Sequence, residues 1–204
     1  MNFDPVARHY DWLARLIFGK SITNAQIIHF KKIKNNAKIL IVGGGTGWIM
    51  EFLPVNYQSI TFIEPSKKML SIAQSRELSH HIEFINANVE DVPLELEYDV
   101  IITNFFFDLF DNTQGNAITR KLLSSLKEEG IWIQTDFERN GIWWQTVMLV
   151  IMYLFFNITT GLSTRRLSDW KVFFRSAGME MIEGISFYRE FISTICYKKP
   201  CLSV

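Results

Sequence analysis

Four glycines within five positions, Gly43-Gly44-Gly45-Thr46-Gly47, are the residues whose spacing first points to chemistry. They follow the short apolar run Lys38–Val42, which has the character of a buried strand. Glycine is needed where the backbone turns tightly and approaches a ligand without a Cβ in the way. If a helix begins directly after the turn, its first amides can also face polar ligand groups. The run predicts a ligand-binding turn, with a purely structural turn as the alternative.

Trp48 narrows the kinds of ligand that this turn could hold. A nicotinamide or flavin fingerprint counted from Gly43 has its third small residue where Trp48 stands. An indole at that position would obstruct the close packing of a helix on its strand. The loop therefore speaks against a dinucleotide, although glycine spacing on its own is a weak signal.

An acidic residue follows the second apolar run. Glu64 ends residues 59–63, about 20 positions after the glycine loop, where a carboxylate can accept hydrogen bonds from both hydroxyls of a ribose. A helical stretch begins directly behind it with Pro65 and Ser66. This position favours a nucleoside-binding carboxylate over an ordinary acid at the end of a strand.

Two further side chains are candidates for moving protons. Asp108 lies in residues 103–110, after another apolar run, where it is placed to act as a general base or to hold a donor near a substrate. A helix cap is an equally open interpretation of Asp108. His9, in an N-terminal helical stretch, is a second candidate base, with an ordinary surface histidine as the alternative.

Composition limits the class of protein. The 204 residues are 48% hydrophobic, and 21 Lys+Arg balance 21 Asp+Glu. A chain of this size buries about 70% of its unfolded surface, which suits a single domain over residues 1–204. The balanced charge offers no general positive field, so no nucleic-acid partner is expected. Two cysteines and an N-terminus without an apolar leader predict a cytoplasmic protein without a metal site.

Periodicity divides the chain into alternating strands and helices. Near-continuous apolar runs separated by helical stretches are typical of an α/β protein whose parallel sheet is covered on both faces. The predicted strands are 38–42, 59–63, 81–85, 99–103 and 131–135, followed by an antiparallel hairpin of 181–188 and 190–197. The predicted helices are 6–18, a second one from a Ser21 or Thr23 cap to Lys34, 46–53, 66–78, 113–126 and 167–177.

This ordered set of motifs resembles the class I S-adenosylmethionine-dependent methyltransferases, and most of all the branch that contains ubiquinone/menaquinone C-methyltransferases. Residues 39–53, 60–70, 81–93 and 98–110 carry the resemblance, which extends over residues 37–136. It implies a Rossmann-like fold with a mostly parallel seven-stranded sheet, a C-terminal antiparallel hairpin and helices on both faces. It also implies S-adenosylmethionine as the cofactor.

The resemblance gives roles to individual residues. The loop glycines would approach the methionine moiety of the cofactor, Glu64 would bind its ribose, and Asn88 would meet its adenine amine. The motif after the fourth strand would line the methionine and the reaction centre. The implied cofactor-binding residues are Gly43, Gly44, Gly45, Thr46, Gly47, Glu64, Pro65, Ser66, Met69, Asn88, Val89, Thr103, Asn104 and Phe105.

Two positions depart from the family pattern. The family usually has an acid two places before the first glycine, where this chain has Ile41, so the methionine amino group must be held by another group or in another way. Asn88 replaces the usual Asp but keeps an oxygen that accepts a hydrogen bond. Tyr10, in a stretch similar to the family segment that folds over the cofactor, is expected in the pocket as a third catalytic candidate.

An uncharged segment, residues 140–164, follows the predicted fifth strand. A membrane-spanning helix is not expected here, because it would separate that strand from the hairpin of the same sheet. Residues 142–158 are instead expected to form a buried helix, to form a lid over the acceptor, or to contact either the inner membrane face or a second copy in a homodimer. The chain is thus divided into a helical cap (1–36), a cofactor-binding core (37–136), an apolar insertion or lid (140–164), and a C-terminal helix and hairpin (165–204).

The motifs together predict methyl transfer from S-adenosylmethionine to a small, hydrophobic acceptor molecule. Segment 103–110 lacks the Asn/Asp-Pro-Pro-Tyr pattern of enzymes that methylate nucleic-acid bases, which agrees with the neutral charge. The alternative is a non-catalytic module of the same fold that binds S-adenosylmethionine, a membrane or a partner. Ile41 and Asn88 motivate that alternative.

Overall fold

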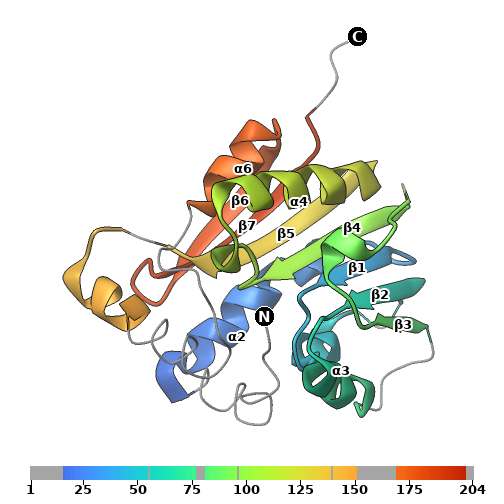
Figure 1. Cartoon of the computed structure of the whole chain (residues 1–204), viewed down its shortest axis with the longest axis horizontal. Helices are drawn as coiled ribbons and strands as arrows, with labels where there is room; N and C mark the ends of the chain where they lie inside the picture. Colours follow the sequence, from blue (N-terminus) through green and yellow to red (C-terminus); the bar gives the residue numbers. More distant parts are fainter. Residues whose placement is uncertain are drawn as a thin grey trace.

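The computed structural model describes residues 16–54, 56–76, 81–95, 97–138, 140–150 and 169–200. These ranges contain a seven-stranded sheet with the strand order β3-β2-β1-β4-β5-β7-β6 (Figure 1). Its strands are β1 (Lys38–Val42), β2 (Ser59–Ile63), β3 (Ile82–Ile85), β4 (Tyr98–Asn104), β5 (Leu126–Phe137), β6 (Glu180–Phe187) and β7 (Ile192–Lys198).

Strand direction divides the sheet into two parts. β1 pairs in parallel with both β2 and β4, and β3 and β5 extend the parallel part on either side. β7 is antiparallel to both β5 and β6, so a C-terminal hairpin completes the sheet. The predicted α/β fold, mostly parallel with a closing hairpin, is confirmed.

The parallel strands are apolar on both sides because helices cover both faces of the sheet. In β1, Ile39 and Ile41 pack into the core on one face, while Leu40 and Val42 pack into the core on the other. All four side chains are buried. Ile41, where the family has an acid, thus lies inside an apolar core.

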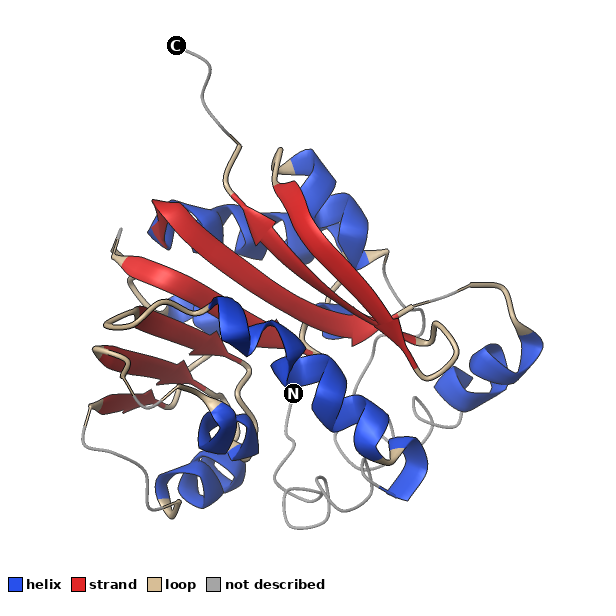
Figure 2. Ribbon diagram, turned by 180° about the vertical axis from the view of Figure 1, so that it is seen from behind, coloured by secondary structure: helices blue, strands red, loops and turns tan. Residues whose placement is uncertain are grey.

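Different helices cover the two faces (Figures 1 and 2). On one face lie α2 (Lys20–Ile27), the 3₁₀ helices η1 (Ile28–Lys32) and η2 (Trp48–Phe52), and α3 (Lys67–Gln74). On the other face lie α4 (Asn112–Ser125) and α6 (Trp170–Ser176), which pack against each other. Two more 3₁₀ turns, η3 (Val89–Asp91) and η4 (Phe107–Leu109), follow β3 and β4.

Two expected helices differ from the structure. The stretch 46–53 forms only the 3₁₀ helix η2, because Pro54 restricts Leu53 to an extended conformation (ψ 148°) that ends it. An α-helix N-terminus therefore does not follow the glycine loop. The second N-terminal helix starts after Gly19, whose positive φ ends the preceding turn, so Ser21 and Thr23 lie inside α2 instead of capping it.

The remaining differences concern boundaries and the N-terminus. β5 begins at Leu126, directly after α4, and is longer than the expected strand 131–135, because Leu126 already pairs with Tyr98 of β4. Residues 16–18 are helical, and the rest of the expected helix 6–18 lies outside the described residues. His9 and Tyr10 are among those residues.

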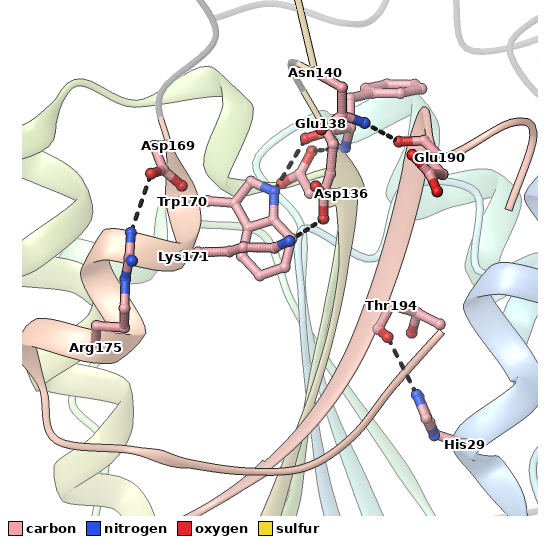
Figure 3. Close-up of polar contacts among 11 residues, drawn as sticks. His29, Asp136, Glu138, Asn140, Asp169, Trp170, Lys171, Arg175, Glu190 and Thr194 are labelled. Atoms are coloured by element: carbon pink, nitrogen blue, oxygen red, sulfur yellow. Dashed lines mark hydrogen bonds and ion pairs between the residues drawn. The ribbon is translucent and has the colours of Figure 1, made fainter. Parts of the chain in front are cut away.

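The insertion after β5 leaves the sheet and returns to it at almost the same place (Figure 3). On the returning side, Trp170 Nε1 donates a hydrogen bond to the Phe137 carbonyl over 3.0 Å, and Lys171 forms an ion pair with Glu138. On the departing side, Asn140 Nδ2 donates to the Glu190 carbonyl over 2.6 Å. Asn140 before the insertion and residues 170–171 after it are thus held at the β6–β7 turn and the end of β5.

Residues 143–150 form a helix at the start of this insertion. Its Leu149 is buried against Phe137 and Phe191, whereas Trp143 is 76% exposed. Among the described residues, no helix is both long enough and apolar enough to cross a membrane.

The contact between α4 and α6 predicts the effect of one substitution. Gly115 lies on the buried side of α4, and a Cβ at this position would come within 2.4 Å of the Phe173 ring. Gly115→Ala should lower the free energy of unfolding by about 1–3 kcal/mol, because overpacking outweighs the better helix propensity of alanine. Chemical denaturation measures this change. Gln114→Ala, at an exposed neighbouring position, is the control and should show no such loss; a stabilised Gly115→Ala protein would contradict the prediction.

Candidate functional site

The candidate residues gather where the parallel strands end. The chain leaves β1 toward β2 on one side and later returns to place β4 on the other, so the strand order reverses between β1 and β4. Ligands in open α/β sheets bind outside the carboxyl ends of the strands at such a switch point. The glycine loop leaves β1 at this point, and Asn104 ends β4 beside it.

The glycine loop is shaped by close packing beneath it and open space above it. A Cβ on Gly44 would lie 2.2 Å from the Phe62 ring, so only glycine fits there. Gly45 has a φ of +58°, and a Cβ on it would meet nothing nearer than the Met69 sulfur at 3.9 Å. The loop therefore presents its backbone at Gly45 to a space that a ligand can enter.

Glu64 joins the glycine loop to the start of α3. Its side chain is buried; Oε2 accepts the Gly45 N–H over 2.9 Å, and Oε1 accepts the Ser66 N–H over 2.8 Å. Ser66 in turn caps α3 by accepting the Met69 N–H over 3.2 Å. Both carboxylate oxygens thus accept backbone N–H groups at this edge of the sheet. The ribose role of Glu64 stays a prediction.

Two asparagines follow β3 at the same edge of the sheet. Asn86 Nδ2 donates to the carbonyls of Glu64 and Pro65, both over 2.9 Å, and so fixes the chain next to the carboxylate. The exposed Asn88 donates to Asp91 over 3.3 Å, which leaves its amide oxygen available. Val89 is buried in the core, so only its backbone remains for a ligand. The adenine-binding role of Asn88 stays a prediction.

Two neighbouring side chains at the end of β4 differ in their hydrogen bonding. Thr103 is fully buried, and its hydroxyl accepts a hydrogen bond from Trp132 Nε1 over 2.7 Å and binds Gln134. Asn104 differs, because its amide nitrogen and oxygen are both buried without a hydrogen-bond partner among the described residues. Phe105, which follows it, has a φ of +50°, a conformation that non-glycine residues rarely adopt. Such strain often accompanies a functional site.

Two buried carboxyl groups lie behind this turn. Asp136, near the end of β5, accepts on Oδ2 the N–H groups of Phe107 (3.1 Å), Asp108 (3.3 Å) and the Gln134 side chain (3.2 Å). Its Oδ1 accepts the Phe137 N–H over 2.9 Å. Asp108 is also buried, but its Oδ1 has no partner among the described residues. Asp136 therefore fixes the turn that carries Asp108.

Burial dominates the acid–base properties of this pair. It raises the pKa of Asp136 to about 7, against four N–H groups that favour the charged form. Burial and then the charge of Asp136 raise the pKa of Asp108 well above its usual value. Asp108 is thus protonated under conditions in which an ordinary aspartate is charged, which weakens the hypothesis that it is a general base at neutral pH.

The structure brings most of the predicted site residues to one edge of the sheet. It also places two further polar residues there. Gly43 to Gly47, Glu64, Ser66, Asn88, Asn104 and Phe105 all follow the ends of β1 to β4. Sequence reasoning missed Asn86 and Asp136. Asn86 directly follows the apolar strand β3, and Asp136 lies near the end of β5. A polar residue at the end of an apolar run is the same signal that identified Glu64.

Comparison with known proteins decides the family. Residues 39–130, from β1 into β5, match the family model described as a methyltransferase domain. With the relatives named below, this match supports a class I S-adenosylmethionine-dependent methyltransferase domain over these residues. The resemblance recognised in the sequence is thereby confirmed.

The relatives of this chain are named for different acceptors. A malonyl-[acyl-carrier protein] O-methyltransferase of Acetivibrio thermocellus is 29% identical over 139 residues, which cover 67% of this chain and 48% of that protein. A ubiquinone/menaquinone biosynthesis C-methyltransferase of Rubrivivax gelatinosus is 22% identical over 185 residues, covering 90% of this chain and 70% of that protein. The chain spans about half the length of the malonyl-specific relatives it matches.

A solved structure shows the same fold. The 1,6-didemethyltoxoflavin-N1-methyltransferase of Burkholderia thailandensis, with bound 1,6-didemethyltoxoflavin and S-adenosylhomocysteine, has a TM-score of 0.69. The two chains are 13% identical, and the match covers 95% of this chain and 84% of the other. At this identity the likeness concerns the fold alone.

The residues of this site fit the family cofactor. Glu64 supplies a strand-end carboxylate for ribose, and Gly45 leaves open space above the loop. The unpaired amide of Asn104 offers a donor and an acceptor to a ligand with amino and carboxylate groups. These residues lie on three neighbouring strands. The acid absent at Ile41 has no counterpart on β1, whose side chains are apolar from Ile39 to Val42.

The acid pair predicts how the stability of this protein depends on pH. The folded state holds the Asp136 proton more tightly than the unfolded state does, so the contribution of the pair to stability falls as pH rises from about 4 toward about 7. Asp108→Asn removes one of the two acids and should raise the free energy of unfolding at pH 8 by about 1–2 kcal/mol, with little change at pH 5.

Urea denaturation of both proteins at the two pH values measures this difference. Glu90→Gln, at an exposed position, is the control and should leave the pH dependence unchanged. An Asp108→Asn protein that is equally destabilised at both pH values would show that the buried acid acts through packing instead of charge.

Proposed function

We propose that this chain binds S-adenosylmethionine and transfers its methyl group to a small, hydrophobic acceptor molecule. The observation that carries the proposal is the arrangement of Glu64, the open side of Gly45 and the unpaired Asn104 amide around one switch point. When bound, the cofactor supplies an electrophilic methyl carbon, whose bond to sulfur breaks as an acceptor lone pair attacks it, leaving a neutral thioether.

The chain's own residues bind the cofactor and orient it toward the acceptor. Glu64, held in place by the Gly45 N–H, binds the ribose, and Asn104 fixes polar groups of the methionine moiety. Because the methyl donor is already reactive, alignment of the acceptor and exclusion of water are the main tasks, and alignment can contribute ~7–11 kcal/mol. A base is needed only where the acceptor loses a proton.

An aromatic cluster supports the hydrophobic character of the acceptor. Phe105, directly after Asn104, packs against Phe137 with ring centroids 4.7 Å apart. Phe137 contacts Phe191 at 5.1 Å, and Phe191 contacts Trp144 of the insertion at 5.6 Å. Aromatic rings thus run from the turn after β4 to the helix 143–150, on the side of the site away from Glu64. The named relatives act on unlike acceptors, so the choice of acceptor rests on this cluster.

A second candidate function is a binding module without turnover. The helix 143–150 exposes Trp143 (76%), Val147 (49%) and Val150 (51%), which recur at helical spacing on its outer side. A membrane surface at the inner face of a cytoplasmic membrane, or a second copy in a homodimer, would cover such a surface. This interpretation accounts for the exposed residues but leaves the buried polar groups of the site without a purpose.

Cofactor binding tests the proposal directly. Titration calorimetry with S-adenosylmethionine and with its demethylated product, S-adenosylhomocysteine, should give micromolar dissociation constants. A saturating ligand should also raise the melting temperature, since ligand at 100 times the dissociation constant adds ~2.7 kcal/mol of stability. Absence of both heat and thermal shift would refute the proposal.

The variant Glu64→Gln tests whether Glu64 belongs to the cofactor-binding site. The loss of carboxylate charge should weaken binding of both ligands at least about tenfold, or ~1.4 kcal/mol. Glu90→Gln, an exposed glutamate after β3, is the matched control and should bind like the original protein. Equal binding by both variants would remove Glu64 from the site. Turnover with any small acceptor would show that the chain is an enzyme and would exclude a binding module without turnover.

A further inference from the structure

The glycine loop is bound by residues at both ends of α3. Before the helix, Glu64 Oε2 accepts the Gly45 N–H over 2.9 Å. After the helix, Arg76 Nε donates a hydrogen bond to the Thr46 carbonyl over 2.7 Å. Arg76 directly follows Ser75, the C-terminal cap of α3, and lies 30 positions from Thr46 along the chain. The two ends of one helix are thus joined to neighbouring residues of the loop.

These bonds fix two peptide groups of the loop. In the Thr46–Gly47 peptide, the carbonyl accepts the bond from Arg76 and the N–H donates to the Gly44 carbonyl over 3.0 Å. In the Gly44–Gly45 peptide, that same carbonyl accepts this bond, and the N–H donates to the strand-end carboxylate. The Gly45–Thr46 peptide therefore lies between two fixed neighbours, next to the open space above the loop.

The Arg76 side chain is itself oriented by an ion pair. Its partner is Glu51 of η2, the 3₁₀ helix that directly follows the loop. The side chain of Arg76 is 20% exposed and that of Glu51 is 48% exposed, and an ion pair of this kind adds little stability by itself. The bond to the carbonyl of the buried Thr46 is the stronger contact, because its donor is charged.

Packing joins α3 to the same part of the loop. Gly47 has a φ of +71°, and a Cβ on it would come within 2.8 Å of the Ala73 side chain and within 2.6 Å of Met50 Cε. Any larger residue at Gly47 would be both strained and crowded. The loop therefore meets α3 through its backbone, at a distance that suits the bond from Arg76.

The elements on either side of the loop in the sequence contribute in another way. β1 contributes buried apolar side chains from Ile39 to Val42, and η2 is a five-residue 3₁₀ helix. The polar groups of the loop are held instead by the end of β2, where the Ile63 carbonyl accepts the Gly43 N–H over 2.9 Å, by Glu64, and by Arg76. Of these contacts, only the one from Arg76 binds a carbonyl.

We propose that Arg76 is a positioning residue of the cofactor site, which holds the glycine loop in its binding conformation through the Thr46 carbonyl before a ligand is present. This inference rests on the proposed function, because the cofactor is the ligand of the loop. A loop that is already ordered loses less entropy when its ligand binds, so the bond raises the affinity for the cofactor.

Hydrogen exchange in the ligand-free protein tests whether the loop is ordered in advance. The chain has 11 glycines, so labelling with isotopic glycine reduces the NMR spectrum to few backbone amide signals. The Gly45 and Gly47 amides should exchange at least about a hundredfold more slowly than those of an unstructured chain. Exchange of both amides at the unstructured rate would overturn the inference, and this measurement needs no variant.

The variant Arg76→Ala tests the contribution of the arginine. Without ligand, its Gly45 and Gly47 signals should shift and exchange about tenfold faster, whereas the Gly115 amide in α4 should not change. A merely structural role would instead lower global stability and accelerate all protected amides. The dissociation constants of S-adenosylmethionine and S-adenosylhomocysteine should both rise about tenfold, measured by calorimetry at a temperature at which circular dichroism shows a folded variant.

Two further variants serve as comparisons. Glu51→Gln removes the ion pair but keeps the bond from Arg76 to the loop, so both affinities should change less than about threefold. Arg120→Ala, at an exposed position of α4 on the other face of the sheet, is the matched control and should bind like the original protein. Equal losses for Glu51→Gln and Arg76→Ala, or unchanged loop signals in Arg76→Ala, would overturn the inference.

Failure of the inference differs from failure of the proposed function. If neither ligand binds the original protein, the proposed function fails, while the exchange rates of the loop amides still decide whether Arg76 orders the loop. If both ligands bind and Glu64→Gln weakens them but Arg76→Ala does not, the proposed function stands and the positioning role of Arg76 is refuted.

Discussion

The site depends on one constraint, which is that the parallel strands are covered on both faces. Helices on both sides leave apolar side chains on β1 from Ile39 to Val42. The polar side chains of the candidate site lie instead at the edge where strands end. Glu64, Asn86, Asn104 and Asp136 each lie at or after such an end, and the hydrogen bonds between neighbouring turns follow from the strand order.

Much of this edge could be predicted because its signals are local. Apolar runs identify the strands, and glycine spacing with an acid at the next strand end identifies the loop and Glu64. Other features depend on contacts between distant residues. Asp136 binds the amide of Phe107, which is 29 positions away, and this pairing becomes visible only once β5 is known to lie beside β4. The failure of the helix after Gly47 had a local signal in Pro54, whose effect on Leu53 outweighs the helical pattern.

The acid pair illustrates a cost accepted at a functional site. A chain of hydrogen bonds connects Trp132 to Thr103, Thr103 to Gln134 and Gln134 to Asp136, so the carboxylate is supported by the core itself. Support of this kind fixes the position of the charge without neutralising it. Apolar residues of similar size would give a more stable fold, because burial of an uncompensated charge is unfavourable. Retention of two acids at this turn is therefore consistent with a use other than stability.

The fixed ends of the insertion have a consequence for how such a protein can change. Asn140 is bound to Glu190, and Trp170 and Lys171 are bound to the end of β5, so residues on both sides of the insertion are held at the sheet (Figure 3). The entropy of closing a loop grows slowly with its length, by about 0.6 kcal/mol for each doubling. Segments of different length and composition can therefore be exchanged between the same two anchors. The two anchors therefore allow this insertion to differ in length and composition while the edge of the sheet that carries Glu64 and Asn104 keeps its own contacts.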